Sequence, residues 1–264
     1  MNIEERAALR YKVGLLYDMQ RLRIQAKGRI NNPKSPIKLY EADKEFLSNI
    51  GGNLDELEKH IEKDVARIVR SHPLWEAFLK DQRGIAEKTG GVLISSIDIT
   101  KSRTPSSLWL YTGLGVVPNV VCSKCEHKSW QNKGICQKQV KKNKICGAIT
   151  IPLEDKEGNI IKGRQRPIPG EKLGYNKWLR SKLIGVIGPN FLKAGNPCRK
   201  TYDDYKARIE TQDHWKSKGH RHNASIRYMM KWWLVEFWTA WRELEGLEVR
   251  VPYSEEFLGK KHGK

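Results

Sequence analysis

The sequence predicts a mainly α-helical protein with one small, cysteine-rich insertion. Two long stretches near the N-terminus repeat apolar residues every three to four positions, which is the period of an amphipathic helix. A tryptophan-rich stretch near the C-terminus has the same period, whereas four cysteines within the 25 residues from Cys122 to Cys146 interrupt it. These three observations favour helices packed on helices, with a separate element held by the cysteines.

Residues 1–72 are expected to form a helical hairpin or a short coiled coil. The first helix is predicted over residues 4–29, and the prolines of NNPKSP end it because proline breaks a helix interior. A second apolar series then follows. The two series are Leu9, Val13, Leu16, Met19 and Leu22, then Leu54, Leu57, Ile61, Val65 and Ile68. The spacing fits a hairpin within one chain and a dimerisation arm equally well, and a homo-oligomer is the expected assembly.

Residues 73–121 predict a helix-hairpin-helix segment. A helix is expected from Pro73 to Gln82, followed by a turn at Arg83 and Gly84 and by a second apolar segment after GG at positions 90–91. In such a motif the backbone N–H groups of the turn and of the second helix's N-terminus bind a DNA phosphate. The usual motif has a second glycine two residues after the first, where this chain has Ala86. A plain helical turn without DNA contact is the alternative.

Residues 122–150 predict a zinc knuckle or ribbon. The predicted ligands are Cys122, Cys125, Cys136 and Cys146. Four thiolates hold Zn²⁺ tetrahedrally, and such a structural metal folds a short segment that has no apolar core of its own. The second pair of cysteines is not a C-x-x-C, so His127 is an alternative ligand. Cys198 is remote in sequence and is expected to be a free thiol.

The charge of the chain indicates a polyanionic partner. The chain has 49 basic and 30 acidic residues, a net charge of +19, and such an excess opposes a compact state unless a polyanion is bound. Residues 1–121 hold 19 basic and 15 acidic residues, a net charge of +4, whereas residues 159–231 hold 17 and five, a net charge of +12. Nucleic acid is the leading partner. No apolar run approaches the roughly 18 residues of a membrane span, and the charged N-terminus differs from a secretory signal, so a cytoplasmic protein without a membrane partner is expected.

Three segments occur in an order that carries a resemblance. They are RGIAEKTGGVLISSIDITKSRTPSSLWLYTGLGV, PGEKLGYNKWLRSKLIGVIGPNFLK and KGHRHNASIRYMMKWWLVEFWTAWRELEGL. Together they resemble the C-terminal helix-hairpin-helix domain of insertion-sequence transposases of the IS-one-ten type, over roughly residues 70–250. The resemblance implies a DNA-binding protein of a mobile element that acts in DNA transposition or recombination, beside the nucleoid of a prokaryote or in a virus. It also suggests a guide or structured RNA, and a nuclease supplied in trans, as further partners.

Two departures separate this chain from that family pattern. The family has an N-terminal α/β domain with acidic nuclease residues, whereas residues 1–70 are predicted to be helical here. The family also has a nucleophilic serine just before the arginine pair of its LRRAL helix. The matching position is Trp178, and Ser181 follows nearly a turn later. Ser181 is therefore the candidate catalytic residue, Mg²⁺ is expected only if the chain is catalytic, and enzymatic activity is left open.

Residues 151–264 are expected to complete the helical domain with a basic terminal helix. This helix is predicted to begin at Ala224 with Asn223 as its N-cap, and Gly246 marks its end. Its predicted core stripe is Ile226, Met230, Trp233, Phe237, Trp241 and Leu244. The preceding residues form a polar lead-in that is expected to face phosphate. A metal group made by His214, His220 and His222 is the alternative for the histidines.

The candidate nucleic-acid-binding residues come from these segments. They are Arg83, Gly84, Lys88, Lys124, Lys128, Lys141, Lys142, Lys172, Lys177, Arg180, Lys218, His220, Arg221, His222, Arg227 and Lys231. Asp203, Asp204 and Glu210 are interpreted as a solvated helix face, with magnesium ligation as the alternative. Two further functions stay open: a recombinase that uses Ser181 or a nuclease partner, and an RNA-binding protein of a phage or mobile element whose aromatic side chains stack on bases.

Overall fold

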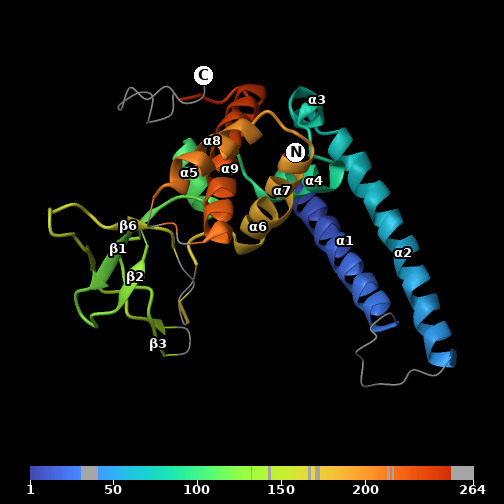
Figure 1. Cartoon of the computed structure of the whole chain (residues 1–264), viewed down its shortest axis with the longest axis horizontal. Coiled ribbons are helices and arrows are strands. Elements are labelled where there is room, and N and C mark those ends of the chain that lie inside the picture. The colour runs from blue at the N-terminus through green and yellow to red at the C-terminus, as the bar shows by residue number, and fades with distance from the viewer. Residues whose placement is uncertain are drawn as a thin grey trace. The chain divides into compact units, whose positions relative to one another are not determined.

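The computed structural model describes residues 1–30, 41–131, 133–141, 144–165, 168–169, 173–212, 215 and 217–250. It is mainly helical with a small sheet region, as the sequence predicts. The chain divides into two compact units, Met1–Asp98 and Ile99–Lys264, called unit 1 and unit 2 below (Figure 1). Within the described residues, no helix is both long enough and apolar enough to cross a membrane.

Unit 1 is built from helices. They are α1 (Ile3–Ile30), α2 (Glu41–Arg70), α3 (Pro73–Ala77), the 3₁₀ turn η1 (Leu79–Asp81) and α4 (Glu87–Ser96). Helix α1 confirms the first predicted helix to within one residue at each end. Lys12 pairs with Asp64, whereas Arg23, later in α1, pairs with Asp55, earlier in α2. The two long helices therefore run antiparallel, side by side (Figure 1).

The core of unit 1 lies where α4 meets α1 and α2. Leu9, Val13 and Leu16 are fully buried, as predicted. Leu22 and Leu57 were expected on the same apolar faces, but they are 42% and 52% exposed. The reason is that α4 reaches along α1 only as far as the hydrogen bond from Lys88 to Gln20, so the residues beyond it are covered by one helix instead of two.

The prediction of one continuous helix from Pro73 to Gln82 is wrong, because the helix is interrupted at Phe78. Helix α3 ends at Ala77, and Phe78 has the non-helical φ of −148° before η1 begins. Leu74 and Leu79 are both fully buried. Five residues apart on an unbroken helix, they would point about 140° away from each other. The break lets both side chains reach the same core.

The turn predicted at Gly84 is present, with φ at +94°. Helix α4 begins at Glu87, so the two glycines at positions 90–91 lie inside it instead of ahead of it. A Cβ at Gly91 would lie 3.0 Å from Val13 Cγ2 and 3.1 Å from Val65 Cγ1. Glycine is therefore required there by the close approach of α4 to α1 and α2, although it weakens the helix.

The helices of unit 2 surround α9. They are α5 (Pro105–Tyr111), α6 (Lys177–Lys182), the π-helical turn η2 (Leu183–Ile187), α7 (Gly188–Lys193), α8 (Arg199–Glu210) and α9 (Lys218–Leu244). Helix α9 contacts α5, η2, α7 and α8 (Figure 1). The predicted core stripe is buried from Ile226 to Trp241. Its last member, Leu244, is 39% exposed, because it is the final residue of the helix and lies beyond the packing partners.

Helix α9 begins six residues earlier than predicted. Its N-cap is Ser217, whose hydroxyl accepts the His220 N–H at 3.1 Å, while Asn223 lies exposed inside the helix. The prediction followed the apolar stripe, whereas the first turns face solvent and are held by the cap. Gly246 has φ at +63°, which confirms the predicted end of the helix.

A small antiparallel sheet completes unit 2. Strand β1 (Val117–Cys122) pairs with β2 (Lys128–Trp130), β5 (Thr150–Pro152) and β6 (Lys162–Gly163). A separate hairpin joins β3 (Gln139–Lys141) to β4 (Lys144–Ile145), and every residue of these two strands is exposed. The hairpin therefore contributes no apolar core. An interaction other than the burial of its own strand residues has to hold it against the sheet.

Candidate metal centre and candidate nucleic-acid interface

Two backbone loops bring the four cysteines of the sheet region together. Cys122 ends β1, and the Cys125 N–H donates to its sulfur at 3.4 Å across a tight turn. On the other side, the Gly147 N–H donates to the Cys136 carbonyl at 3.1 Å, which places Cys146 beside Cys136. Gly147 has φ at +70°, a conformation that favours glycine. Backbone pairing thus brings together thiols that are separated in sequence.

The four sulfurs have the geometry of a metal site. Cys122 Sγ lies 3.8 Å from Cys146 Sγ, and Cys125 Sγ lies 3.7 Å from Cys136 Sγ. All four sulfurs lie within 4.8 Å of one another. A tetrahedron with Zn–S bonds of about 2.3 Å has edges of about 3.8 Å, whereas a disulfide needs about 2.05 Å. The predicted ligand set is therefore assembled, and His127, the alternative ligand, lies outside the group.

The environment of the cysteines differs between the two sides of the site. The backbone N–H groups of Cys125 and then Lys124 lower the pKa of Cys122. Burial raises the pKa of Cys136, and the neighbouring sulfurs raise it further. A cation at the centre of four thiolates offsets both their burial and their mutual repulsion. The arrangement is thus compatible with a structural metal ion.

The alternative histidine metal group does not form among the described residues. The hydroxyl of Tyr202 lies 2.7 Å from His222 Nδ1, whereas the ring of His220 lies beside Trp215, with 4.6 Å between the ring centroids. His214 lies outside the described residues. The two described histidines therefore face different partners.

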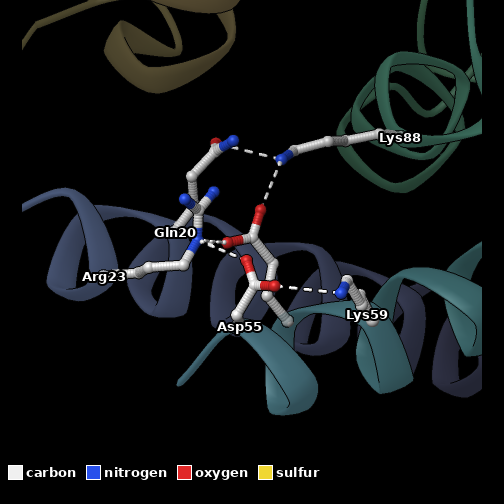
Figure 2. Close-up of polar contacts among 6 residues, drawn as sticks. Gln20, Arg23, Asp55, Lys59 and Lys88 are labelled. Carbon is white, nitrogen blue, oxygen red and sulfur yellow. Dashed lines mark hydrogen bonds and ion pairs between the residues drawn. The ribbon is translucent and has the colours of Figure 1, made fainter. Parts of the chain in front are cut away.

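Lys88 belongs to a polar network that joins α1, α2 and α4 (Figure 2). Its ammonium donates to Gln20 Oε1 at 2.9 Å and lies 3.8 Å from Glu58 Oε1. Arg23 Nε donates to the same carboxylate at 2.7 Å. Burial lowers the pKa of Lys88, although Glu58 opposes the shift. With 16% of its side chain exposed, Lys88 is engaged within unit 1.

The Gly84 turn leads into α4, whose first residue carries a carboxylate. Arg83 is exposed on this turn. Glu87 lies in the first turn of α4, and Arg70 Nε from α2 donates to its carboxylate at 2.7 Å. The positive end of the α4 dipole thus already has a carboxylate beside it. An anionic ligand approaching this helix end would meet that negative charge.

The predicted lysines of the sheet region are on the surface of unit 2. The described ones are Lys124, Lys128 and Lys141, and all three are exposed. Lys177, at the start of α6, is exposed as well. Lys142 and Lys172 lie outside the described residues. The four described lysines are therefore accessible from solvent on unit 2.

Three predicted cations lie around the C-terminal end of α5. Arg180 Nη1 donates to the Gly113 carbonyl at 2.6 Å. The Lys231 ammonium lies 4.2 Å from the centre of a Trp109 ring, and the Trp109 indole N–H donates to the Lys231 carbonyl at 2.9 Å. Arg227 precedes Lys231 by one turn of α9 and is half-buried. The three cations therefore come from α6 and α9 to one end of α5.

Arg164 is a fourth cation near this place, and the sequence reasoning missed it. It follows β6 directly and is exposed. Burial lowers the pKa values of Arg180 and Arg227, and the charge of Arg164 lowers both further. No motif marks Arg164 in the sequence. The only available signal was the basic composition of residues 159–231.

The predicted basic lead-in forms the first turns of α9. Lys218 and His220 are exposed there. Arg221 is half-buried, and its Nη1 donates to the Trp215 carbonyl at 2.8 Å, while His222 contacts α8. Because these residues are helical, their side chains point in different directions around α9 instead of facing one ligand together. The sequence predicts these residues as a polar lead-in ahead of the helix.

Ser181 and the acidic residues of α8 show no shared site. Ser181 is exposed on α6, and its hydroxyl donates at 2.7 Å to the backbone carbonyl three residues earlier. Among the described residues, no histidine or carboxylate hydrogen-bonds to it. Asp203 and Asp204 pair with Arg199 and Lys200, one turn earlier on the same helix. Exposed pairs of this kind fit the solvated helix face that the sequence predicted.

Comparison with protein-family models, with curated proteins and with solved structures finds no match to this chain. Neither a family nor a relative is therefore assigned, and any function has to be inferred from the residues and their contacts.

Proposed function

We propose that unit 2 binds the phosphate backbone of nucleic acid, with duplex DNA as the preferred partner. The observation that carries this proposal is the distribution of charge. Residues 99–264 hold 32 basic and 15 acidic residues, a net charge of +17, whereas residues 1–98 hold 17 and 15, a net charge of +2. Self-repulsion opposes the folding of a unit with such a surplus, and a bound polyanion removes the repulsion while releasing its own counterions.

The contacts of the cations support the same proposal. In unit 1, basic side chains face carboxylates between helices. Examples are Arg6 with Asp98, Lys12 with Asp64, Arg23 with Glu58 and Arg70 with Glu87. In unit 2, several basic side chains lie over aromatic rings. Examples are Arg180 over Tyr175, Arg208 over Tyr205 and Lys231 over Trp109. A ring orients a cation without neutralising it, so its charge remains available to a ligand.

The metal of the cysteine site is Zn²⁺ in this proposal. Four thiolates at tetrahedral spacing suit zinc, which contributes no redox chemistry of its own. Its role is structural, because the exposed β3–β4 hairpin has no apolar core to hold it. A fixed sheet region presents Lys124, Lys128 and Lys141 as point charges for backbone phosphates. Sequence readout is not expected from lysines alone.

DNA transposition or recombination is the process proposed for this binding, on the basis of the resemblance of the three quoted segments to IS-one-ten-type transposases. The helix-hairpin-helix interpretation of the Gly84 turn belongs to the same proposal. Because Glu87 stands at that helix end, the turn would contribute less than the cations of unit 2. In this scheme the α1–α2 hairpin serves as a dimerisation arm, and the protein resides beside the nucleoid.

A gel-shift titration tests the proposed partner. Labelled duplex, branched and single-stranded DNA and RNA of equal length are incubated with the full chain over a range of salt concentrations. Tightest binding to duplex or branched DNA, with affinity falling steeply as salt rises, is the expected result. Absence of binding to every DNA form at low salt would refute the proposal. Tighter binding to RNA than to any DNA would favour the RNA-binding alternative.

The same incubation with Mg²⁺ separates binding from catalysis. Among the residues that the structure describes, Ser181 hydrogen-bonds only to its own helix, and a serine without an adjacent base is not an activated nucleophile. The expected result is therefore a shifted band without cleavage. Magnesium-dependent cleavage that disappears in Ser181→Ala would establish the recombinase alternative instead. Ser107→Ala is a suitable control, because Ser107 lies in the capping turn of α5 and not on α6.

A further inference from the structure

The C-terminal end of α5 is a meeting point for cations from three parts of unit 2. Gly113, just beyond the helix, has φ at +70° and its carbonyl accepts from Arg180. Asn176 ties α6 to the same place, since its N–H donates to the Tyr111 carbonyl at 2.8 Å. Trp109 ties α9 to it through its hydrogen bond to the Lys231 carbonyl. These contacts fix where the cations stand relative to each other.

Three guanidinium groups interact at this place. They are Arg164, Arg180 and Arg227, because the charge of Arg164 acts on both of the others and that of Arg180 acts on Arg227. Arg180 and Arg227 are half-buried, and burial followed by the neighbouring guanidinium charges lowers the pKa of Arg227. Lys231 lies one turn after Arg227 on α9, and its ammonium faces the Trp109 ring. Among the described residues, none of the three arginines forms an ion pair with a carboxylate. The cluster therefore combines partial burial, like charge and no anion of the protein's own.

Such a cluster is unfavourable in an isolated protein. Partly desolvated like charges repel one another more strongly than solvated ones, because the surrounding medium screens them less. The aromatic ring of Tyr175 beside Arg180 offsets this only in part. In unit 1, cations held between helices face carboxylates, as Arg23 faces Glu58. The buried Arg242 of unit 2 instead donates to the backbone carbonyls of Ile99, Ser102 and Glu248. The three arginines have neither arrangement in full, since within the described part of the chain Arg180 donates to the Gly113 carbonyl and the other two have no hydrogen bond to protein. An external anion is the missing counterpart.

We propose that Arg164, Arg180 and Arg227 form a phosphate-binding site near the end of α5. The proposal rests on the proposed function in one respect: the phosphate is taken to be one phosphodiester of a nucleic-acid backbone that crosses unit 2. Guanidinium groups bind phosphate oxygens through two parallel hydrogen bonds, and three of them can bind one tetrahedral anion from different sides. The half-buried Arg180 and Arg227 would hold the nucleic-acid backbone in one position. The solvated lysines of the sheet region would not, because their side chains are flexible.

The test uses the full chain, a double variant and a matched control. The double variant is Arg164→Gln with Arg227→Gln, because neither side chain has a hydrogen bond to protein among the described residues. The control is Arg199→Gln with Lys200→Gln, which also removes two cations of the same unit, each of which already pairs with an aspartate. Two measurements are made on each protein. The first is the change in Tm caused by inorganic pyrophosphate relative to chloride at equal ionic strength. The second is the affinity for a duplex as a function of salt.

The site predicts a difference between the double variant and the control. Pyrophosphate should raise the Tm of the wild type and the control but not of the double variant, because only a folded site binds the anion. Duplex affinity should fall about tenfold or more in the double variant. The slope of log K against log salt should become shallower by about 0.9 for each phosphate that the variant no longer neutralises. The affinity of the control should fall less than threefold.

Two outcomes separate this inference from the proposed function, and a folding check decides which variant is used. If the wild type binds duplex and the double variant behaves as the control does in both measurements, the phosphate site is wrong while nucleic-acid binding stands. If no nucleic acid binds but pyrophosphate stabilises the wild type and not the double variant, the site stands with free phosphate as its ligand and the proposed function fails. If the double variant has a circular dichroism spectrum unlike the wild type, the Arg164→Gln single variant replaces it, because that side chain is exposed.

Discussion

Replacing Cys146 with serine should release the metal from unit 2 without unfolding its helices. The variant removes one of four sulfurs that stand 3.7–3.8 Å apart in two pairs. Structural zinc sites bind with an apparent free energy of about 10–16 kcal/mol. One ligand of four therefore accounts for about 2.5–4 kcal/mol, which corresponds to a loss of roughly 60- to 700-fold in affinity. Since β3 and β4 bury nothing, the hairpin should open when the metal leaves.

The assay is a zinc competition with a chromophoric chelator, combined with metal analysis and circular dichroism. Wild type should hold one zinc per chain, and Cys146→Ser should release it at far lower chelator concentration while keeping its helical signal. Cys198→Ser is the matched control, because this cysteine lies outside the group and burial raises its pKa to about 12. The reasoning is refuted if Cys146→Ser and Cys198→Ser retain zinc equally well, or if the wild type binds none.

Two further predictions concern unit 1. Gly91→Leu should destabilise the protein by about 1–3 kcal/mol in denaturant unfolding, because even a Cβ there would lie 3.0 Å from Val13 Cγ2. Gly52→Ala, the control, should stabilise the protein by roughly 0.5–1 kcal/mol, because a Cβ there would meet nothing within 4 Å. Equal effects of the two variants on the free energy of unfolding would contradict the close packing at Gly91. The hydrogen bond from Lys12 holds the pKa of Asp64 below its usual range. Its stabilising contribution is therefore present above about pH 4 and is lost as the pH falls through the lowered value. The Tm difference between wild type and Lys12→Gln should be constant near neutrality and vanish in acid; a difference that persists at pH 2 would exclude this pair as its cause.

The sequence predicted a helix, a core face and a ligand group correctly where a strong local pattern determines each of them. The apolar period of α1 fixed its bounds, and the tryptophan-rich stripe of α9 placed five core residues correctly. The cysteine group was predictable because a segment of that composition has no other source of folding energy. In each case one physical requirement, burial or metal ligation, dominates over the neighbouring residues.

The sequence failed where tertiary packing overrides a local pattern. Residues 73–82 have a good helical pattern, yet the helix breaks at Phe78 so that two leucines reach one core. The start of α9 was missed because a polar first turn resembles a loop until its Ser217 cap is seen. Arg164 was missed because only folding brings the end of β6 beside α6 and α9. Sequence spacing carries no signal for such a meeting.

Cations face carboxylates between the helices of unit 1, whereas several cations of unit 2 lie over aromatic rings instead. The proposal that these cations of unit 2 bind nucleic acid is tested most directly by the salt dependence of duplex binding by the full chain. If the three arginines near the end of α5 and the lysines of the sheet region neutralise phosphates, log K should fall against log salt with a slope steeper than about −2.7, the value for three phosphates. A slope near zero, or no binding to duplex at low salt, would contradict the account.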